Sequence, residues 1–360
     1  MPKHLLLIAL ILFLPKNVFS ENFKYIDSLS LRLTEQSVQS LEDLVSYCEQ
    51  YTQSDVARVR FYFVWVATHI QYDESLNTEN QSPEQVFSNK KAICSGYSRL
   101  FAFLCAKSGM AARYVSGYAK ETNDVTSIQN HAWNIVRIDG QWQAFDVTWA
   151  ANELEESSED SISPAFETWF MPEATLFQAT HLPFDPAFQL TSKLVSRAVF
   201  FGDKSTNTEG GILLDSVAHF TDILNKDLTL DSIEQACRSF QRAYDFMPMD
   251  SAVAIKLVKA QEFKVKQSFE YVFQYKLKNY RDMPHTSTEI LRGQLSKLQA
   301  LDTSLTEAIV LHKSLVIYPL SPHNRRMLEY NQNFFEELWR FYKVAKMEID
   351  REINSRQSQD

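Results

Sequence analysis

The stretch Lys91-Ala92-Ile93-Cys94-Ser95-Gly96-Tyr97-Ser98-Arg99-Leu100 places a cysteine where an amphipathic helix is expected to begin. Apolar residues continue at helical spacing through Tyr97, Leu100, Phe101 and Leu104, and Gly109 supplies a stop signal. A thiol in the first turn of a helix lies at the positive end of the helix dipole, which favours the thiolate. Cys94 is therefore a candidate nucleophile.

Two strand-like runs follow this helix, His131–Ile138 and Gln141–Trp149, and Asp139-Gly140 separates them. An Asp-Gly pair between such runs is a strong signal for a tight β-hairpin. A further strand is expected upstream, at Arg113–Ala119, because the run alternates and is rich in aromatic and β-branched residues. The pattern predicts an antiparallel sheet packed against the Cys94 helix.

The hairpin turn gives a register that places two chemically important side chains together. If Ile138 faces Gln141 across the turn, Trp133 faces Asp146 and His131 faces Thr148. His131 and Asp146 are then diagonal neighbours on one face, with Cα atoms about 7–8 Å apart. A hydrogen bond between the imidazole and the carboxylate is within reach.

Composition describes an ordinary globular protein of about two domains, with 360 residues, 45% of them hydrophobic and 22% charged. The formal net charge of -9 argues against broad binding of nucleic acid, which needs a basic face. A loop-like stretch at 201–211 marks a boundary. We expect one domain over residues 21–200 and a helical domain over residues 201–360.

Residues 1–20 resemble a secretory signal peptide. Lys3 and His4 precede an apolar run, Leu5–Leu14, and Val18-Phe19-Ser20 resembles a cleavage site. The run is too short to cross a bilayer, and no other stretch approaches the required ~20 apolar residues. We expect an exported protein, secreted or periplasmic, without stable membrane insertion. The alternative is a buried N-terminal strand or helix.

Four cysteines, Cys48, Cys94, Cys105 and Cys237, raise the question of disulfides in an exported protein. Cys94 and Cys105 are eleven residues apart on one expected helix, about 16 Å, which is too far for a bridge. A Cys48–Cys237 bridge would cross the two domains, and the sequence leaves it open. Cys105 falls near the buried stripe as an inert core thiol. The spacings do not fit zinc.

Helix signals frame these elements. Ser54 and Ser82-Pro83 are caps for helices upstream of Cys94, whereas residues 151–164 read as an acidic surface loop. From about residue 215 the pattern is helical, with helices expected after Asp231, over 251–279, over 287–317 and from Pro322. The remaining histidines are expected to be structural or exposed on the surface: His69, His181, His219, His285, His312 and His323.

The order Cys94, His131, Asp146 suits thiolate chemistry, which needs a nucleophile, a base and a group that fixes the imidazole tautomer. The backbone N–H of Cys94 is one candidate oxyanion donor. The second donor and the cleft walls remain open among upstream and hairpin side chains: Trp65, Gln71, Tyr72, Trp133 and Trp149. Taken singly, each residue is equally compatible with a structural role.

Three motifs resemble those of the transglutaminase-like superfamily: Cys94-Ser95-Gly96-Tyr97, His131-Ala132-Trp133-Asn134 and Asp146-Val147-Thr148-Trp149. The resemblance covers about residues 55–195. A later segment that contains His181-Leu182-Pro183-Phe184-Asp185-Pro186 resembles the kyphoscoliosis-peptidase and cytokinesis-protein subgroup. Phe188 stands where this subgroup usually has tryptophan, and the helical half has no recognised counterpart.

The resemblance implies an α+β, papain-like core with Cys94 as nucleophile, His131 as base and Asp146 as the group that orients it. We therefore expect a cysteine enzyme that acts on peptide or protein amides through a thioester. The sequence does not distinguish a peptidase or amidase from a protein-glutamine acyltransferase, and we favour hydrolysis over amine transfer. No cofactor or metal is expected, and a protein partner for the helical domain is left open. The alternative is a non-catalytic binding or scaffolding module on the same fold.

Overall fold

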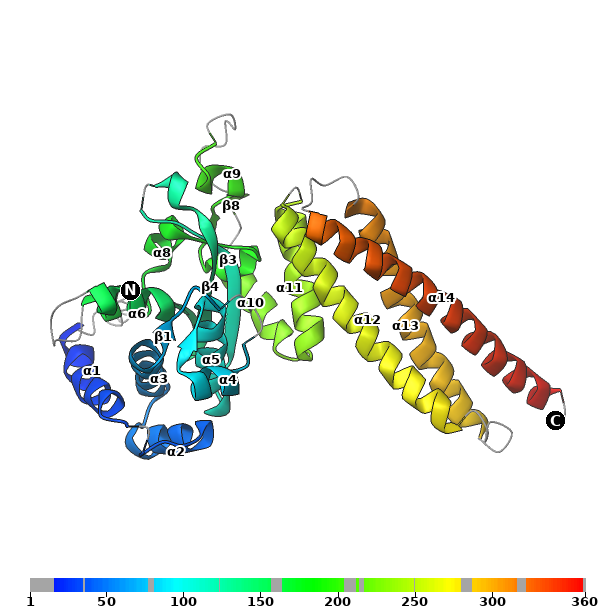
Figure 1. Cartoon of the computed structure of the whole chain (residues 1–360), viewed down its shortest axis with the longest axis horizontal. Helices are drawn as coiled ribbons and strands as arrows, with labels where there is room; N and C mark the ends of the chain where they lie inside the picture. Colours follow the sequence, from blue (N-terminus) through cyan, green and yellow to red (C-terminus); the bar gives the residue numbers. More distant parts are fainter. Residues whose placement is uncertain are drawn as a thin grey trace, which may run out of the picture. The chain divides into compact units, whose positions relative to one another are not determined.

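The computed structural model describes residues 16–34, 36–76, 81–122, 124–156, 164–203, 212–213, 217–248, 250–279, 287–315 and 322–358. Figure 1 shows the course of the chain. Two compact units are present: residues 1–183 with 187–223, and residues 184–186 with 224–360. The units thus meet at residue 223/224, whereas the boundary expected from sequence composition stands at 200/201.

In the first unit, helices and short strands alternate along the chain, and some of the strands form a central sheet (Figure 1). Its helices are α1 (Lys16–Leu31), α2 (Leu41–Tyr51), α3 (Asp55–His69), α4 (Pro83–Asn89), α5 (Cys94–Lys107), α6 (Val147–Glu156), α7 (Pro164–Trp169), α8 (Ala174–Thr180) and α9 (Arg197–Phe200). Its strands are β1 (Gln71–Tyr72), β2 (Lys91–Ala92), β3 (Ala112–Ala119), β4 (Gln129–Ile138), β5 (Gln141–Phe145), β6 (His181–Pro183), β7 (Lys193–Leu194) and β8 (Ile212–Leu213). Short 3₁₀ helices lie at Val125–Ser127 and Pro186–Gln189.

Helix α3 is the centre of the first unit. The Ser54 side chain accepts a hydrogen bond from the Ala57 N–H, which caps the helix as the sequence predicts. Every residue from 59 to 67 is buried, and α3 packs against α1, α5 and α6. The Phe63 ring lies 5.3–6.4 Å from four other phenylalanine rings, which joins α3 to α5, β5 and the segment after β5.

A buried arginine on α3 fastens the N-terminal helix to this core. Arg60 Nε and Nη2 donate to the two carboxylate oxygens of Asp27 on α1, at 2.8 and 2.9 Å. Arg60 Nη2 also donates to Glu167 at 3.0 Å, and the guanidinium lies 4.9 Å from the Phe23 and Phe170 ring centres. Both members of the Arg60–Asp27 pair are buried, so their hydrogen bonds offset the cost of desolvating two charges.

The start of α5 falls at Cys94, as the sequence predicts. A capping box of Ser82 and Gln85 opens α4, and Lys90, at φ 54°, ends it in the left-handed region. The chain then pairs β2 with β1 in parallel before α5 begins. Gly109 ends the helical stretch at φ 80°, a conformation that favours glycine. Local signals therefore position the thiol at a helix N-terminus.

The main sheet has the strand order β5-β4-β3-β6, with all pairs antiparallel. The predicted hairpin register is confirmed: Ile138 pairs with Gln141 and Asn134 with Phe145. Asp139 and Gly140 both have positive φ, at 49° and 81°, as a tight turn of the favoured hand requires. Helix α5 packs on β3 and β4, where the Asn134 side-chain amide donates to the Ser98 carbonyl at 2.8 Å.

Two sequence predictions about the segment after Phe145 were wrong. Strand β5 ends at Phe145 instead of Trp149, and residues 147–156 form α6 instead of a strand end followed by an acidic loop. The physical reason is Asp146, whose Oδ1 accepts the Trp149 N–H at 3.0 Å while its carbonyl accepts the Ala150 N–H. This cap outweighs the strand propensity of Val147 and Thr148. The rest of the expected loop, 157–163, lies outside the described residues.

Helix α10 (Val217–Asp227) spans the boundary between the units. The second unit continues with α11 (Ser232–Phe246), α12 (Ser251–Asn279), α13 (Thr288–Leu315) and α14 (Pro322–Gln357). Asp231 caps α11 through the N–H groups of Ile233 and Glu234, as expected. The aromatic stripe of α14 is core packing, with Phe335 and Tyr342 buried. The expected break at 283–284 and the cap at 321 lie outside the described residues.

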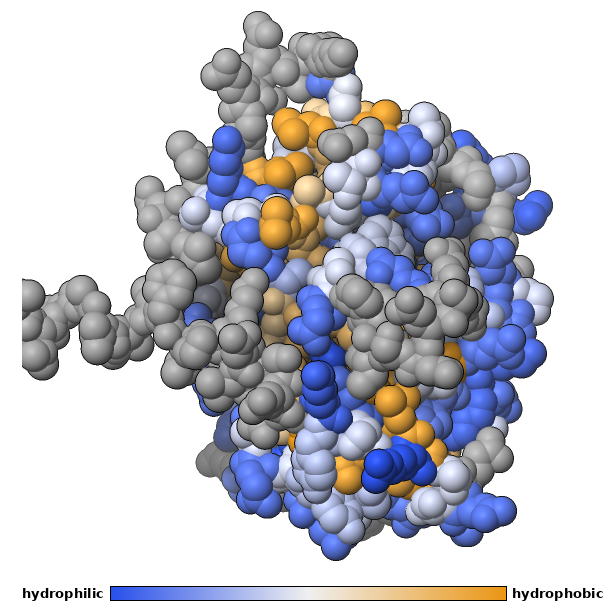
Figure 2. All heavy atoms as spheres, turned by 90° about the vertical axis from the view of Figure 1, so that its left-hand side faces the viewer, coloured by the Kyte–Doolittle hydropathy of each residue, from blue (hydrophilic) through white to orange (hydrophobic). Residues whose placement is uncertain are grey.

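The expected fold class is confirmed: an α+β core in which α5 packs on an antiparallel sheet, followed by a helical C-terminal region. The face drawn in Figure 2 is mostly hydrophilic where it is coloured, and its hydrophobic areas lie between polar side chains. Among the described residues, none of the helices has both the length and the apolar character that a bilayer span requires. The expected signal peptide stays a prediction, because residues 1–15 are outside the described part.

Candidate active site

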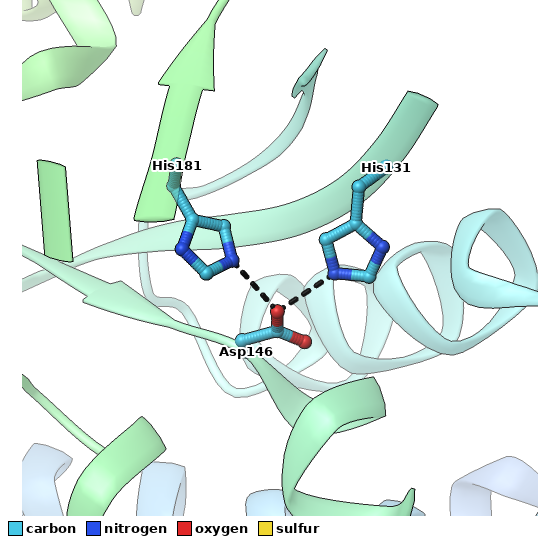
Figure 3. Close-up of side chains that lie close together, drawn as sticks. All are labelled: His131, Asp146 and His181. Atoms are coloured by element: carbon cyan, nitrogen blue, oxygen red, sulfur yellow. Dashed lines mark hydrogen bonds and ion pairs between the residues drawn. The ribbon is translucent and has the colours of Figure 1, made fainter. Parts of the chain in front are cut away.

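The side chains of His131 and Asp146 are hydrogen-bonded in the interior of the first unit. His131 Nε2 lies 2.7 Å from Asp146 Oδ2, and Figure 3 shows the imidazole directed at the carboxylate. His131 is 7% exposed and Asp146 is fully buried. The hairpin register brought the two residues near each other, but the contact is made from the N-cap of α6 instead of from a strand. The short distance is typical of a charge-assisted bond.

Cys94 lies at the first position of α5 and is half-buried. The Cys94 thiol is among the groups that raise the pKa of the His131 imidazole, so the thiol lies beside that ring. Because Nε2 of His131 is directed at Asp146, Nδ1 is the nitrogen that is left for the thiol. The structure thus places the Cys94 thiol and the Asp146 carboxylate beside the same imidazole. None of the four cysteines forms a disulfide, the open Cys48–Cys237 pair included.

His181 is a member of this cluster that sequence reasoning missed. The sequence interpretation left it as a structural or surface histidine, but its Nε2 lies 3.0 Å from the same Asp146 Oδ2 (Figure 3). His181 opens β6, which pairs with β3. The available signal was its place in the segment that resembles the end of the family's domain; the missing information was that this segment adds a strand to the sheet.

Neighbouring charges and burial determine the protonation states of His131, Asp146 and His181. Burial opposes charge on His131, but the Asp146 carboxylate and the Cys94 thiol outweigh it and raise the pKa of His131 well above its ordinary value. Burial likewise disfavours the Asp146 anion, yet both imidazoles lower the pKa of that carboxyl. Burial lowers the pKa of His181 to about 4 in spite of Asp146. At neutral pH the cluster therefore holds a charged His131, an ionised Asp146 and a neutral His181.

The upstream oxyanion candidates lie in different surroundings. The Trp65 ring is buried and stacks on His69 and Phe87, at 4.9 and 5.7 Å between ring centres. Gln71 is exposed on β1 and lines a pocket of about 520 Å³ with Lys91. Burial raises the pKa of the Tyr72 hydroxyl, and the interaction with Cys94 adds to this increase. Tyr72 is the candidate for which an interaction with Cys94 is present.

The hairpin candidates Trp133 and Trp149 surround the imidazoles. The Trp133 ring lies 6.1 Å from His131 and 4.9 Å from His181, and the Trp149 ring lies 5.4 and 4.6 Å from the same two rings. Trp133 is 1% exposed. These indoles exclude water from the cluster, which strengthens its electrostatic interactions.

His131, Asp146 and His181 also form a group that could hold a metal ion. Their ligand atoms all lie within 4.8 Å of one another. A transition metal bound to them would need contacts of about 2.0–2.2 Å to nitrogen and oxygen. In the structure, both imidazoles instead meet one carboxylate oxygen at hydrogen-bond distances. These hydrogen bonds account for all three side chains, and the expectation that no metal is required stays a prediction.

Comparison with known proteins places this site in a family. Residues 42–147 match the family model of the transglutaminase-like superfamily, so the chain carries a transglutaminase-like domain. This span includes Cys94, His131 and Asp146.

Among curated proteins the chain is similar to kyphoscoliosis peptidase of Mus musculus, with 30% identity over 177 residues, 47% of this chain and 26% of that protein. It is equally similar to kyphoscoliosis peptidase of Homo sapiens, with 30% identity over 184 residues, 47% of this chain and 27% of that protein. The chain spans about a quarter of the length of these curated relatives.

Two solved structures show a slight likeness. One is a candidate cysteine protease from Cytophaga hutchinsonii, with 17% identity over 39% of this chain and 45% of that chain and a TM-score of 0.26. The other is a TGase, with 23% identity over 39% of this chain and 35% of that chain and a TM-score of 0.26. Neither likeness carries an argument at these TM-scores.

Proposed function

We propose that this protein is a cysteine enzyme that acts on peptide or protein amides through a thioester on Cys94, with hydrolysis favoured over amine transfer. The observation that carries the proposal is the hydrogen bond from His131 to the buried carboxylate of Asp146, with the Cys94 thiol beside the same imidazole at the start of α5. A charged imidazole next to the thiol favours the thiolate, which is the nucleophilic form. The similarity to kyphoscoliosis peptidase supports the hydrolytic choice.

In the first half-reaction, the Cys94 thiolate attacks the carbonyl carbon and a C–S bond forms while the carbonyl π electrons move to oxygen. The backbone N–H of Cys94 is the first of α5, where a helix offers N–H groups without an intrahelical acceptor, so it is suited to hold the oxyanion. We assign Tyr72 as the second donor. As the C–N bond breaks, the His131 imidazolium gives its proton to the leaving nitrogen.

In the second half-reaction, neutral His131 takes a proton from water, the resulting hydroxide attacks the thioester, and the C–S bond breaks to restore the thiolate and a protonated His131. An amine in place of water would give a crosslinked product by the same steps. Asp146 holds the imidazole in position and stabilises its charge throughout. We further propose that the protein acts after export, on the strength of the signal-like residues 1–20.

The experiment is mass spectrometry of glutamine-containing peptides after incubation with the full chain and a primary amine. Peptide cleavage, deamidation and amine incorporation give different mass changes, and we expect cleavage or deamidation. Cys94→Ala should abolish the product, whereas Cys237→Ala, which removes a thiol from the second unit, should not. Product of equal yield from Cys94→Ala, or no product from any peptide, would favour the non-catalytic binding module instead.

A further inference from the structure

His181 occupies a position that the proposed chemistry does not use. It lies on β6, is 1% exposed, and directs Nε2 at Asp146 Oδ2 from 3.0 Å. That oxygen also receives His131 Nε2 at 2.7 Å (Figure 3). Two imidazoles from two different strands therefore meet on a single carboxylate oxygen.

The hydrogen bonds of Asp146 explain why this second imidazole matters. The carboxylate is fully buried, and its Oδ1 accepts the Trp149 N–H at 3.0 Å. Its Oδ2 accepts from His131 and His181. If a buried carboxylate loses one of these donors, no hydrogen bond offsets the free energy that it costs to remove that oxygen from water. The three donors together also fix the plane of the carboxylate, and hence the direction from which it meets His131.

The tautomer of His181 follows from its two partners. An ionised carboxylate only accepts hydrogen bonds, so Nε2 of His181 must carry a proton. Its Nδ1 lies 2.8 Å from Thr180 Oγ1. The Thr180 hydroxyl is within reach of the Phe177 carbonyl at 3.1 Å as well as of Nδ1; because Nδ1 of a neutral ring is an acceptor, we infer that the hydroxyl donates to Nδ1. Burial, which lowers the pKa of His181 to about 4, is consistent with this neutral ring.

Aromatic rings hold the His181 ring in place. Phe177 stacks on it at 3.9 Å and 7° between planes, and the Trp133, Trp149 and Trp169 rings lie 4.6–5.7 Å away. The ionisable groups that face the ring, among the described residues, are Asp146 and His131; Glu153 is reached only through Trp169 Nε1. The ring therefore has little freedom to do anything other than donate to Asp146.

We propose that His181 is a positioning residue for catalysis: its Nε2–H donates to Asp146 Oδ2 and holds the carboxylate in the orientation that aligns His131 with Cys94. The catalytic role of His181 rests on the proposed function. The hydrogen bond from His181 to Asp146 does not depend on whether the protein turns over a substrate. His181 does not touch the reacting atoms and acts through Asp146 alone.

The first test compares two substitutions at His181 by the rate at which iodoacetamide alkylates Cys94, read on the Cys94 peptide by mass spectrometry. His181→Phe keeps an aromatic ring but has no donor, and His181→Gln keeps an N–H donor near the position of Nε2. We expect His181→Phe to lower the rate at pH 7 by roughly ten- to hundredfold, as for a lost hydrogen bond to a charged group. We expect His181→Gln to stay within about threefold of the wild type.

The pH profile adds a readout that a merely structural role would not move. His181 lowers the pKa of Asp146, so its loss should let Asp146 take up a proton at higher pH. The acid limb of the alkylation profile should therefore move to higher pH in His181→Phe and not in His181→Gln. Equal rates in the two variants, whether both normal or both slow, would overturn the proposal, because the donor would then be irrelevant.

A second measurement needs no variant to fold and no substrate. In the full chain labelled with ¹⁵N-histidine, the ring nitrogen shifts should report His181 as neutral with the proton on Nε2 at pH 7. A wild-type His181 found charged, or protonated on Nδ1 alone, would overturn the proposal.

These readouts separate this inference from the proposed function. If the wild type turns over no peptide but the His181 tautomer and the variant pattern are as expected, the proposed function fails and the positioning role stands. If peptides are cleaved and His181→Phe is as active as the wild type with an unchanged pH profile, the positioning role fails and the function stands.

Discussion

The imidazole rings of His131 and His181 lie 5.8 Å apart, although their strands, β4 and β6, are not neighbours in the sheet. Strand β3 runs between them, and its Gly117 pairs with His131 on one side and with Pro183 on the other. Because Gly117 has no side chain, the Trp133 ring and the backbone of β6 can approach β3 closely on this face. Asp146, at the cap of α6, is then reached by both rings.

Asp146→Asn tests the carboxylate directly. The amide would present a donor where two imidazole N–H groups now donate, which favours the wrong tautomer of His131. We expect peptide turnover and Cys94 alkylation at pH 7 to fall by about 10²- to 10⁴-fold. The control is Asp139→Asn, an exposed position in the hairpin turn where asparagine tolerates the positive φ. A normal rate in Asp146→Asn would contradict the assigned role.

The two histidines should give stability opposite dependences on pH. The raised pKa of His131 means that the folded state binds more protons, so its contribution is complete below pH ~6.5 and is lost as pH rises through the raised value. The lowered pKa of His181 has the reverse effect: its contribution is complete above pH ~6.5 and is lost as pH falls through about 4.

The measurement for this second prediction is the free energy of unfolding of the full chain in urea between pH 4 and pH 9. With respect to these two groups we expect a maximum near neutral pH. His181→Gln should flatten the decline on the acid side and leave the alkaline side unchanged. If the free energy of unfolding of this variant still declines toward pH 4 as in the wild type, His181 is not the group whose protonation causes the decline.

Gly117→Ala should disturb the site through the backbone. An added Cβ would lie 2.2 Å from the Leu182 carbonyl oxygen and 2.5 Å from the Trp133 ring, so β6 or the indole must move. We expect a loss of about 1–3 kcal/mol in the free energy of unfolding and a lower rate of Cys94 alkylation. Gly293→Ala, where the added Cβ meets nothing within 4 Å, is the control, and a similar effect of both changes would count against the close approach at Gly117.

Arg60→Ala should be far more destabilising than Arg58→Ala, although the two residues are neighbours on α3. Arg60 is buried against Asp27, so its removal strands a buried carboxylate, for which we expect a cost of about 3–5 kcal/mol. Arg58 pairs with a partly exposed Asp55, for which we expect about 0–1 kcal/mol. Urea unfolding followed by circular dichroism measures both, and equal costs would mean that the buried pair does not anchor α1.

Local signals in the sequence were enough for much of this fold. The Asp139-Gly140 turn determined the hairpin register, because a two-residue turn leaves no freedom in the pairing of the strands that it joins. Ser54, Ser82 and the apolar stripe after Cys94 determined where α3, α4 and α5 begin. Each of these signals acts over a few residues, so the interaction that decides the structure is contained in the stretch that is read.

Competition between two local signals defeated the sequence interpretation at Asp146. Strand propensity in Val147 and Thr148 predicted a longer β5, but the carboxylate caps a helix and that helix packs on α3. The same residue was nevertheless placed correctly beside His131, because the register up to Phe145 already brings the two residues close together.

The sequence by itself determined the position of Cys94 at a helix start, the hairpin that carries His131, and the proximity of Asp146. Only the tertiary structure decided that His181, fifty residues beyond His131, shares the same carboxylate oxygen, and that Arg60 is buried against Asp27. The reason is physical: strand pairing between β3 and β6 and the docking of α1 on α3 join segments whose distance along the chain carries no signal about their contact.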